Sequence, residues 1–524
     1  MKKSIIIHPF LFAIYPIFFI YANNYKLIGI DQTIFPIAII LCVTLSLLFF
    51  ATMFLKSFIK AGILVTAFLI LFFSYGHVLE FLQILDRSWD KVIIIGRIRY
   101  LLPVWIMTLT VIIYFVQKTD NNPIKFNKML NVVSLILVGL LLINVGIQEI
   151  NKVKYPSKII DLRLSDIQYT TFDSDKIISE LPDIYYIVPD MYTSSDVLIE
   201  FYGYENKELY QFLRKNDFYI AEKSKSNYPW TNMSLSSSLN MDYLHNLIDT
   251  TNNINHFGES TIELIENNKL MQILKSLEYK IVNIESGVHS TNNFQDADLN
   301  IQPGSDDELI VELVRSSMLL HIDGLFGEIK RNRILNTFEE IGKIPEIDKP
   351  TFTLAHISIP HGPYVFGSNG ERVWFSKIFY ENRRWKRGQM ERKHYLNQLI
   401  FTSKKLIELV KSILQNSSVK PIIIIQGDHG PTTFMPDGPW PKNPTKRMLK
   451  ERMGILNAIY LPDRENNLLY NSMSPVNTFR IILNQYFGAN YNLFEDKHYY
   501  SNAWTSNKFL NVTDSLKYFH LLNK

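Results

Sequence analysis

The first 150 residues contain five long stretches without a single acidic or basic side chain. These stretches lie between Lys3 and Lys26, Asp31 and Lys56, Lys60 and Glu80, Arg99 and Lys118, and Lys128 and Glu149. Each holds about 18–24 residues, and a helix that rises 1.5 Å per residue needs about 20 to cross the hydrocarbon core of a bilayer. Soluble helices of this length have a polar face, whereas these stretches are apolar all round. The pattern therefore predicts five transmembrane helices.

From about Asn151 the pattern changes to short β-rich runs that alternate with helical periodicity. The predicted strands are Asp183–Val188, Tyr279–Ile284, Thr351–His356, Pro421–Ile425 and Asn457–Leu461. Segments with helical periodicity lie between them, among them Lys207–Lys215, Leu264–Leu277 and Leu396–Leu414. Strands that alternate with helices of this length are typical of an α/β domain with a mainly parallel central sheet. We expect a transmembrane region at 1–150, a linker at 151–180 and an α/β domain at 181–524.

The charge distribution divides the chain at the same place. The whole chain has 54 Lys and Arg against 50 Asp and Glu, a net charge of +4, so its bulk charge does not indicate nucleic-acid binding. Residues 1–150 contain 12 basic and 6 acidic side chains, and the rest of the chain contains 42 and 44. A single cysteine, Cys42, excludes both an internal disulfide and a zinc site built from cysteines.

The bias of Lys and Arg toward the cytoplasm predicts the orientation. With the N-terminus inside, the inner segments have seven basic residues and the outer loops five, and five spans place residues 150–524 outside. We expect the first span to be retained, because Tyr21–Asn24 lacks the small-residue pattern of a signal-peptide cleavage site. The sequence thus predicts a multi-pass protein of the inner (cytoplasmic) membrane with an extracytoplasmic α/β domain.

Candidate metal ligands follow three of the predicted strands. Asp190 follows the first strand, His361 lies in the loop after the third, and Asp428 and His429 follow the fourth between two glycines. Ligands of such folds bind beyond the carboxyl ends of the strands, and oxygen with imidazole suits a divalent metal.

Each of these residues also has a purely structural interpretation. Asp190 could cap a helix, His361 could be a packed histidine in a proline-stiffened loop, and the Asp428-His429 turn could be a surface loop. Their shared position after strands favours the metal role. For His356, which lies within a predicted strand, we expect a structural role.

A candidate nucleophile lies in the hydroxyl-rich segment Ser226–Leu239, which precedes a helix-like segment, Met241–Ile248. Pro229 favours a helix start, and the residues after it lie among unpaired backbone N–H groups that attract phosphate or sulfate. The Thr231 hydroxyl is a poor nucleophile until a divalent cation lowers its pKa. The alternative is a simple N-cap at a serine-rich helix.

The order of Asp190 after the first strand, Thr231 at a helix start, His361 in a Pro-His-x-Pro loop, and Asp428-His429 resembles the sulfatase-like branch of the alkaline phosphatase superfamily. The resemblance spans about 182–487, and the preceding membrane helices resemble those of the lipoteichoic acid synthase and phosphoethanolamine transferase group. It implies that 181–524 is a sulfatase-like catalytic domain. One Zn²⁺ or Mn²⁺ would be held by Asp190, Thr231, Asp428 and His429.

True sulfatases have Cys/Ser-x-Pro-x-Arg where this chain has Thr231–Leu235, without the proline and the arginine. They also pair two aspartates where this chain has Asp190-Met191. These departures make sulfate ester hydrolysis an unfavoured activity. The resemblance implies instead a single-metal site with a threonine nucleophile.

The resulting hypothesis is a membrane-anchored phosphotransferase. Thr231 would attack a phospholipid head group (phosphoglycerol or phosphoethanolamine), and a cell-envelope glycan or lipid would accept the group from phospho-threonine. His361 would bind the phosphoryl oxygens or donate a proton to the leaving oxygen. The alternatives are a hydrolase of phosphate or sulfate esters on surface polysaccharides and a non-catalytic binding module.

One basic segment of the sequence has no assigned role. The basic, aromatic segment Asn369–Lys393 could be a solvated face or could lie against anionic lipid head groups. Nothing in the sequence indicates an oligomeric state.

Overall fold

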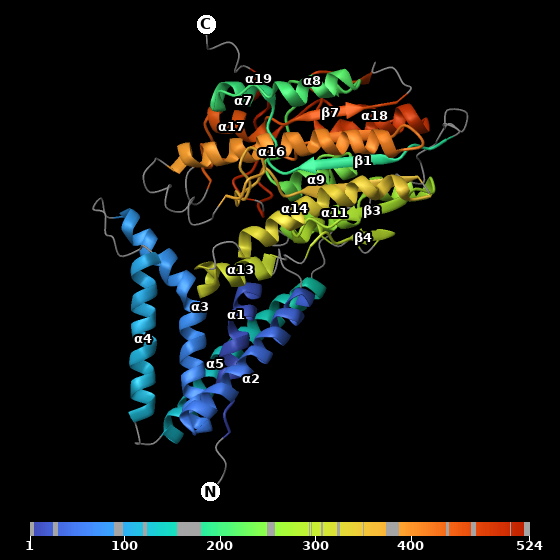
Figure 1. The fold of residues 1–524 in the computed structure, drawn as a ribbon. Helices are drawn as coiled ribbons and strands as arrows, with labels where there is room; N and C mark the ends of the chain where they lie inside the picture. Colours follow the sequence, from blue (N-terminus) through green and yellow to red (C-terminus); the bar gives the residue numbers. More distant parts are fainter. Residues whose placement is uncertain are drawn as a thin grey trace. The chain divides into compact units, whose positions relative to one another are not determined.

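The computed structural model describes residues 5–24, 30–88, 98–118, 123–154, 180–248, 257–292, 294, 296–304, 308–321, 325–348, 350–373, 387–435, 440–462, 468–503 and 505–517. The chain forms two compact units. The helical unit comprises Met1–Pro156 with Asp306–Phe326, and the α/β unit comprises Ser157–Ser305 with Gly327–Lys524. Most of the predicted linker, 155–179, lies outside the described residues. Figure 1 shows the elements of both units.

The helical unit contains long apolar helices joined by short connections. Its long helices are α1 (His8–Asn24), α2 (Ile34–Leu55), α3 (Phe58–Ser88), α4 (Ile98–Lys118) and α5 (Pro123–Lys154). Within the described part of the chain, four segments are long and apolar enough to cross a membrane: Ile30–Leu55, Phe58–Leu79, Leu101–Lys118 and Pro123–Ile150. The predicted count of five spans is not confirmed, because α1 is apolar but has only 17 residues.

The helix α1 lies inside the helical unit, against α2, α3 and α5. Its Ala13, Ile17 and Tyr21 are fully or almost fully buried. By contrast, α2 and α5 expose large apolar side chains such as Phe50 and Leu140. Exposed apolar surface of this extent is typical of helices whose environment is lipid.

A short helix from a distant part of the sequence completes this unit. It is α13 (Glu308–Ser316), which contacts α1 and α3. Its Leu309 is fully buried in a cluster with Ile17, Tyr21 and Val145. The sequence placed this helix in the region 181–524, because nothing in its local pattern shows which apolar surface it covers.

The α/β unit is built on a seven-stranded sheet. Its strands are β1 (Ile184–Pro189), β2 (Tyr219–Ile220), β3 (Lys280–Ile284), β4 (Leu299–Ile301), β5 (Thr351–Ile357), β6 (Ile422–Gln426) and β7 (Asn457–Tyr460), in the order β2-β7-β6-β1-β5-β3-β4. The five strands from β6 to β4 are parallel, and β7 and β2 pair antiparallel at one edge. The prediction of an α/β domain with a mainly parallel sheet is confirmed.

Helices cover both faces of this sheet, so β1 at its centre is buried along its whole length. One face packs Tyr185 and Ile187 against α8 (Lys207–Lys215), α14 (Leu325–Lys343) and α16 (Arg387–Asn416). The other face packs Tyr186 and Val188 against α9 (Thr231–Asn240), α12 (Lys269–Ser276) and α18 (Pro475–Phe487). The remaining helices are α7 (Ser195–Tyr202), α10 (Leu244–Leu247), α11 (Phe257–Glu266), α17 (Lys446–Met453) and α19 (Thr513–Lys517), and a small sheet pairs β8 (Tyr499–Tyr500) with β9 (Leu510–Asn511).

Two predicted helices differ from the structure. The segment Leu264–Leu277 is divided between α11 and α12, because Asn268 caps α12 by accepting a hydrogen bond from the Met271 N–H at 2.9 Å. The segment Met241–Ile248 contains only the single turn α10. The helix in this region is α9, which begins at Thr231 and ends where Met241 takes the left-handed conformation, with φ 55°.

Candidate active site

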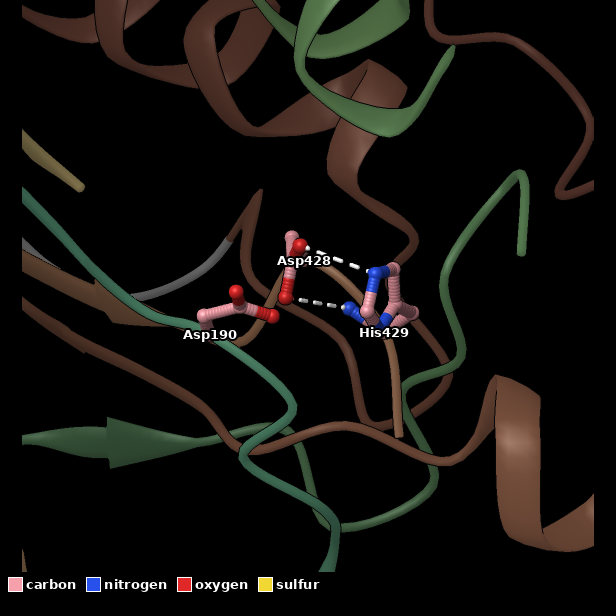
Figure 2. A group of neighbouring side chains, drawn as sticks. All are labelled: Asp190, Asp428 and His429. Atoms are coloured by element: carbon pink, nitrogen blue, oxygen red, sulfur yellow. Dashed lines mark hydrogen bonds and ion pairs between the residues drawn. The ribbon is translucent and has the colours of Figure 1, made fainter. Parts of the chain in front are cut away.

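Two neighbouring strands bring together three side chains that could hold a metal ion. Asp190 directly follows β1, and Asp428 and His429 follow β6, which pairs with β1 in parallel. Each of the three offers one ligand atom, and these atoms lie within 4.8 Å of one another. Figure 2 shows the carboxylates and the imidazole turned toward a common point. All three residues are buried.

The turn after β6 depends on two glycines that have no room for a side chain. A Cβ on Gly427 would lie 2.3 Å from the carbonyl oxygen of Tyr192, and one on Gly430 would lie 2.0 Å from that of Glu451. Both neighbours are backbone atoms, so a residue with a side chain does not fit at either position. This close approach lets Asp428 and His429, which are consecutive, face the same point.

The Asp428 carboxylate is oriented by the backbone around it. Its Oδ1 accepts hydrogen bonds from the N–H of Met191 at 3.0 Å and from the N–H of His429 at 2.8 Å. Met191 has a φ of 65°, a left-handed conformation that turns its N–H toward this carboxylate. With Oδ1 held in this way, Oδ2 is the atom left for a ligand.

The imidazole of His429 presents a lone pair to the same point. Its Nδ1 lies 3.2 Å from the carbonyl oxygen of Gly430. Because a carbonyl oxygen only accepts, Nδ1 has to be the protonated nitrogen and Nε2 the free one. Burial, helped by the charge of Arg452, holds the pKa of His429 well below its usual value, so the ring is neutral.

Thr231 is the first residue of α9, and its hydroxyl faces this imidazole. The Oγ1 atom lies 3.0 Å from Nε2 of His429, so the hydroxyl donates to the lone pair. One turn further along α9, the Ser234 hydroxyl donates to the backbone carbonyl of Asp428 at 2.8 Å. Thus α9 is fixed to the turn after β6, with its N-terminal N–H groups beside the site.

The arrangement fits a divalent cation. Oδ1 of Asp190 and Oδ2 of Asp428 are buried and accept no hydrogen bond from any described residue, and Oδ2 of Asp428 lies 3.1 Å from Nε2 of His429. Burial, and secondarily the charge of Asp428, raises the pKa of Asp190 to about 7. Once Asp190 is ionised, two buried carboxylates that face an imidazole nitrogen favour a bound cation. Two carboxylates and an imidazole suit Zn²⁺ or Mn²⁺.

The two remaining histidines of the prediction lie next to Asp190. His356, which we expected to be structural, is buried in β5, with Nε2 3.8 Å from Oδ2 of Asp190 and Nδ1 2.9 Å from the Thr291 hydroxyl. The backbone N–H of His361 donates to the carbonyl of Asp190 at 3.2 Å. Among the described residues, the group that could hold a metal does not include His361.

The side chain of His361 is held by its own loop. Its Nδ1 lies 2.5 Å from the carbonyl of Gly362 and therefore donates to it. Burial, followed by the positive charge of Lys330, lowers the pKa of His361 to about 4, so the ring is neutral and its Nε2 has a lone pair.

Arg452 was missed in the sequence. Its guanidinium is buried beside the site and donates to the carbonyls of Pro229 and Gly430. Burial lowers the pKa of Arg452 only to about 10, so it stays charged at neutral pH. No local signal marks it, because α17, which contains it, has the composition of an exposed charged helix.

The basic segment 369–393 is described only at its two ends, since 374–386 lie outside the described residues. Arg372 forms an ion pair with Glu328, and Arg392 lies over the ring of Phe434, 5.0 Å from its centroid. Both side chains thus have partners within the α/β unit.

No protein-family model matches the sequence, and no curated protein matches it. Several solved structures are similar. The C-terminal periplasmic domain of EcEptC from Escherichia coli, in complex with zinc, is 12% identical, with 66% of this chain and 96% of that chain covered and a TM-score of 0.46. Lipooligosaccharide phosphoethanolamine transferase A from Neisseria meningitidis, an integral membrane protein, is 13% identical, with 91% and 94% covered and a TM-score of 0.43.

A third similar structure is that of BT1596, a 2-O GAG sulfatase, at 14% identity, with 60% and 72% covered and a TM-score of 0.38. Both groups that the sequence resembles are present among these structures. At such identities and TM-scores, the function of this chain has to be inferred from its own side chains.

Proposed function

We propose that this protein is a membrane-anchored, metal-dependent phosphotransferase that moves a phospholipid-derived head group to a glycan or lipid of the cell envelope. The head group would be phosphoglycerol or phosphoethanolamine. One observation supports this most directly: the Thr231 hydroxyl at the start of α9 lies 3.0 Å from Nε2 of His429, within the cluster of Asp190, Asp428 and His429. A hydroxyl beside a metal site at a helix N-terminus is suited to attack a phosphoryl group.

The membrane helices support a lipid donor. Four described segments can cross a bilayer, and an enzyme anchored in the membrane meets a lipid substrate at a high effective concentration. An acceptor in the cell envelope requires the α/β unit to lie on the extracytoplasmic side of the inner membrane. This is the orientation that the basic residues favour.

In the first half-reaction, Oγ1 of Thr231 forms a bond to phosphorus and the bond from phosphorus to the diacylglycerol oxygen breaks. Asp190, Asp428, His429 and Oγ1 of Thr231 would together hold the ion. A bound Zn²⁺ or Mn²⁺ supplies the positive charge that lowers the pKa of the hydroxyl and offsets the charge of the phosphoryl oxygens. The N–H groups of the first turn of α9 would bind these oxygens and orient phosphorus for in-line attack.

The second half-reaction reverses the exchange. The acceptor hydroxyl attacks phosphorus, the bond to Oγ1 breaks, and Thr231 is restored. In the first half-reaction the neutral Nε2 of His361 would accept the Thr231 proton and give it to the leaving diacylglycerol oxygen. In the second it would accept the acceptor's proton and return it to Oγ1, so the protons balance in each step. Because each half-reaction is a displacement at phosphorus, an enzyme form with the head group bound to Thr231 is expected between the two.

The test is to trap this enzyme form. The full-length protein, reconstituted in vesicles that contain phosphate-labelled phospholipid and no acceptor, should acquire label, and Thr231→Ala should acquire none. Ser236→Ala is the matched control, because this hydroxyl also lies on α9 but donates to Asn232 of its own helix. Label that survives in Thr231→Ala refutes the nucleophile.

The mass of the labelled peptide identifies the transferred group. Phosphoglycerol and phosphoethanolamine add different masses to the peptide that contains Thr231. A hydrolase predicts instead that a small soluble phosphate ester is turned over as fast as the lipid. That result would favour hydrolysis over transfer.

A further inference from the structure

Arg452 connects the two chain segments that contain the nucleophile and the metal-binding imidazole. Its Nε donates to the carbonyl oxygen of Pro229 at 2.7 Å, and its Nη1 donates to that of Gly430 at 2.6 Å. Pro229 stands two positions before Thr231, and Gly430 directly follows His429. A guanidinium can bridge two carbonyls in this way because its N–H groups form a rigid planar fork.

The arginine itself is firmly held. Its backbone carbonyl accepts a hydrogen bond from the N–H of Gly430 at 2.7 Å, so Gly430 is bound through both its N–H and its carbonyl. Trp230 and Trp440 stack on each other with centroids 4.0 Å apart, and the guanidinium carbon lies 5.6 Å and 5.0 Å from their ring centroids. Cation–π contacts of this kind add to the hydrogen bonds.

The bridge also fixes the orientation of the imidazole. The carbonyl of Gly430 accepts both from Nη1 of Arg452 and from Nδ1 of His429. The position of this carbonyl determines which nitrogen of His429 is protonated and where its Nε2 points. Arg452 therefore acts on both partners of the contact between Thr231 and His429.

We propose that Arg452 is a positioning residue that holds the Thr231 oxygen at the metal site and so couples the nucleophile to the ion. The proposal rests on the proposed function in one respect, since it takes Thr231 as a metal ligand. Its test is metal affinity, which requires neither a lipid nor turnover.

The chain contains a matched control for a purely structural role. Arg480 is also buried, and its Nε and Nη1 donate to the carbonyls of Met241 and Asn492, both at 2.8 Å. Its guanidinium carbon lies 3.8 Å from the ring centroid of Phe494. Met241 caps the opposite end of α9, so Arg480→Lys removes an equivalent bridge from the same helix without touching the site.

The experiment is a double-mutant cycle on the full-length protein in detergent, with Zn²⁺ or Co²⁺ affinity as the readout. In the wild-type background, Thr231→Ala should weaken metal binding about 10-fold, since it removes one ligand. In the Arg452→Lys background, Thr231→Ala should weaken metal binding less than about 3-fold. Lysine cannot bridge both carbonyls, so the Thr231 oxygen is already displaced from the ion in this background. The Arg480→Lys background should keep the full 10-fold effect.

Two results would overturn the proposal. One is an equal Thr231→Ala effect in the wild-type and Arg452→Lys backgrounds. The other is no effect of Thr231→Ala in the wild type, since there would then be no contact for Arg452 to hold. If Arg452→Lys does not fold, Arg452→Gln, whose shorter side chain ends in a single amide N–H₂ group and cannot bridge both carbonyls, is taken through the same cycle and judged by the same criterion.

Turnover gives a second and separate readout. If the wild type transfers phosphate, Arg452→Lys should lower kcat at least 10-fold with little change in KM for the lipid, whereas Arg480→Lys should retain the wild-type kcat per folded molecule. Equal losses in the two variants would indicate a structural role and overturn the proposal. A wild type that binds metal but never acquires label would refute the proposed function and leave the metal-affinity cycle to decide on Arg452.

Discussion

Oγ1 of Thr231 lies 3.0 Å from Nε2 of His429, although the two residues are 198 positions apart in the chain. The fold explains this proximity. His429 follows β6, which pairs with the central strand β1, and α9, which begins with Thr231, covers one face of the same sheet. The hydroxyl, the imidazole and two carboxylates therefore meet at one point only in the folded α/β unit.

The substitution Asp428→Asn should remove the metal without harming the fold. Its Oδ1 can still accept from the N–H groups of Met191 and His429, while the new amide N–H₂ replaces the oxygen that lies 3.1 Å from Nε2 of His429. An amide hydrogen there competes with the Thr231 hydroxyl for the lone pair that the ion would use. We expect metal affinity to fall on the order of 100-fold or more, because the anionic ligand is lost.

The stability of the metal-free protein is the control for this substitution. Because both hydrogen bonds to Oδ1 are kept, the free energy of unfolding of Asp428→Asn without metal should stay within about 1 kcal/mol of the wild-type value. Raising the Tm of the variant should take a Zn²⁺ concentration at least about 100-fold higher than raising that of the wild type. The same Zn²⁺ dependence of Tm in both proteins would show that Asp428 is not a ligand.

Asp190 predicts a pH dependence for the metal-free protein. Burial and the neighbouring charge of Asp428 raise its pKa to about 7 in the folded state, against 3.8 when it is unperturbed. Between these values the folded protein binds more protons than the unfolded chain, so this group lowers stability as pH rises from about 4 to about 7. Metal affinity should change in the opposite direction, rising up to about 10-fold per pH unit until the carboxyl is ionised near pH 7.

Buried histidines raise stability as pH rises, whereas Asp190 lowers it, so the contribution of Asp190 has to be measured separately. Burial lowers the pKa of His361 and His498 to about 4, so each adds stability as pH rises from about 4 to 6.5. The contribution of Asp190 is therefore measured as the difference in unfolding free energy between wild type and Asp190→Asn, in chelator, across this range. A difference that stays constant with pH would contradict the raised pKa.

Much of the geometry of the candidate site could be predicted, because its residues follow the ends of strands. The buried strand before Asp428 is nearly all aliphatic, and a parallel sheet brings the carboxyl ends of its strands to one edge. The structure places Asp190, Asp428 and His429 together there. Their roles as ligands stay predictions, as does that of Thr231 as nucleophile.

The rest depends on tertiary contacts that leave no local pattern. Arg452 belongs to a short charged helix, and only the folded chain brings it to the carbonyls of Pro229 and Gly430. Similarly, α13 is amphipathic like any surface helix, and its packing against α1 cannot be read from its sequence. The predicted count of five spans is not confirmed for a different reason: α1 has only 17 residues, which is close to the minimum length of a membrane span.

The substitution Gly430→Ala tests whether the turn after β6 depends on its close approach to neighbouring backbone segments. The Cβ of Gly430→Ala would lie 2.0 Å from the carbonyl of Glu451 and 3.0 Å from that of Gly454, so one of these backbone segments has to move. We expect a loss of about 1–3 kcal/mol in unfolding free energy, together with weaker metal binding, measured by denaturant unfolding and by titration.

The same substitution at Gly342 is the control for Gly430→Ala. This glycine lies within α14, where an added Cβ meets only the Ser412 hydroxyl at 3.4 Å. Alanine favours a helix more than glycine does, so Gly342→Ala should gain about 0.5–1 kcal/mol. If both variants lost the same stability, the close approach at Gly430 would not be the cause.

The orientation in the membrane can be tested with single cysteines. In a Cys42→Ser background, Ser418→Cys introduces an exposed thiol in the α/β unit, and Lys125→Cys introduces one at the start of α5. If α5 crosses the bilayer, these sites lie on opposite faces however many spans precede it. A membrane-impermeant maleimide should therefore label Ser418→Cys in intact spheroplasts and Lys125→Cys only after permeabilisation. The reverse pattern would place the α/β unit in the cytoplasm, where no envelope glycan is available as an acceptor.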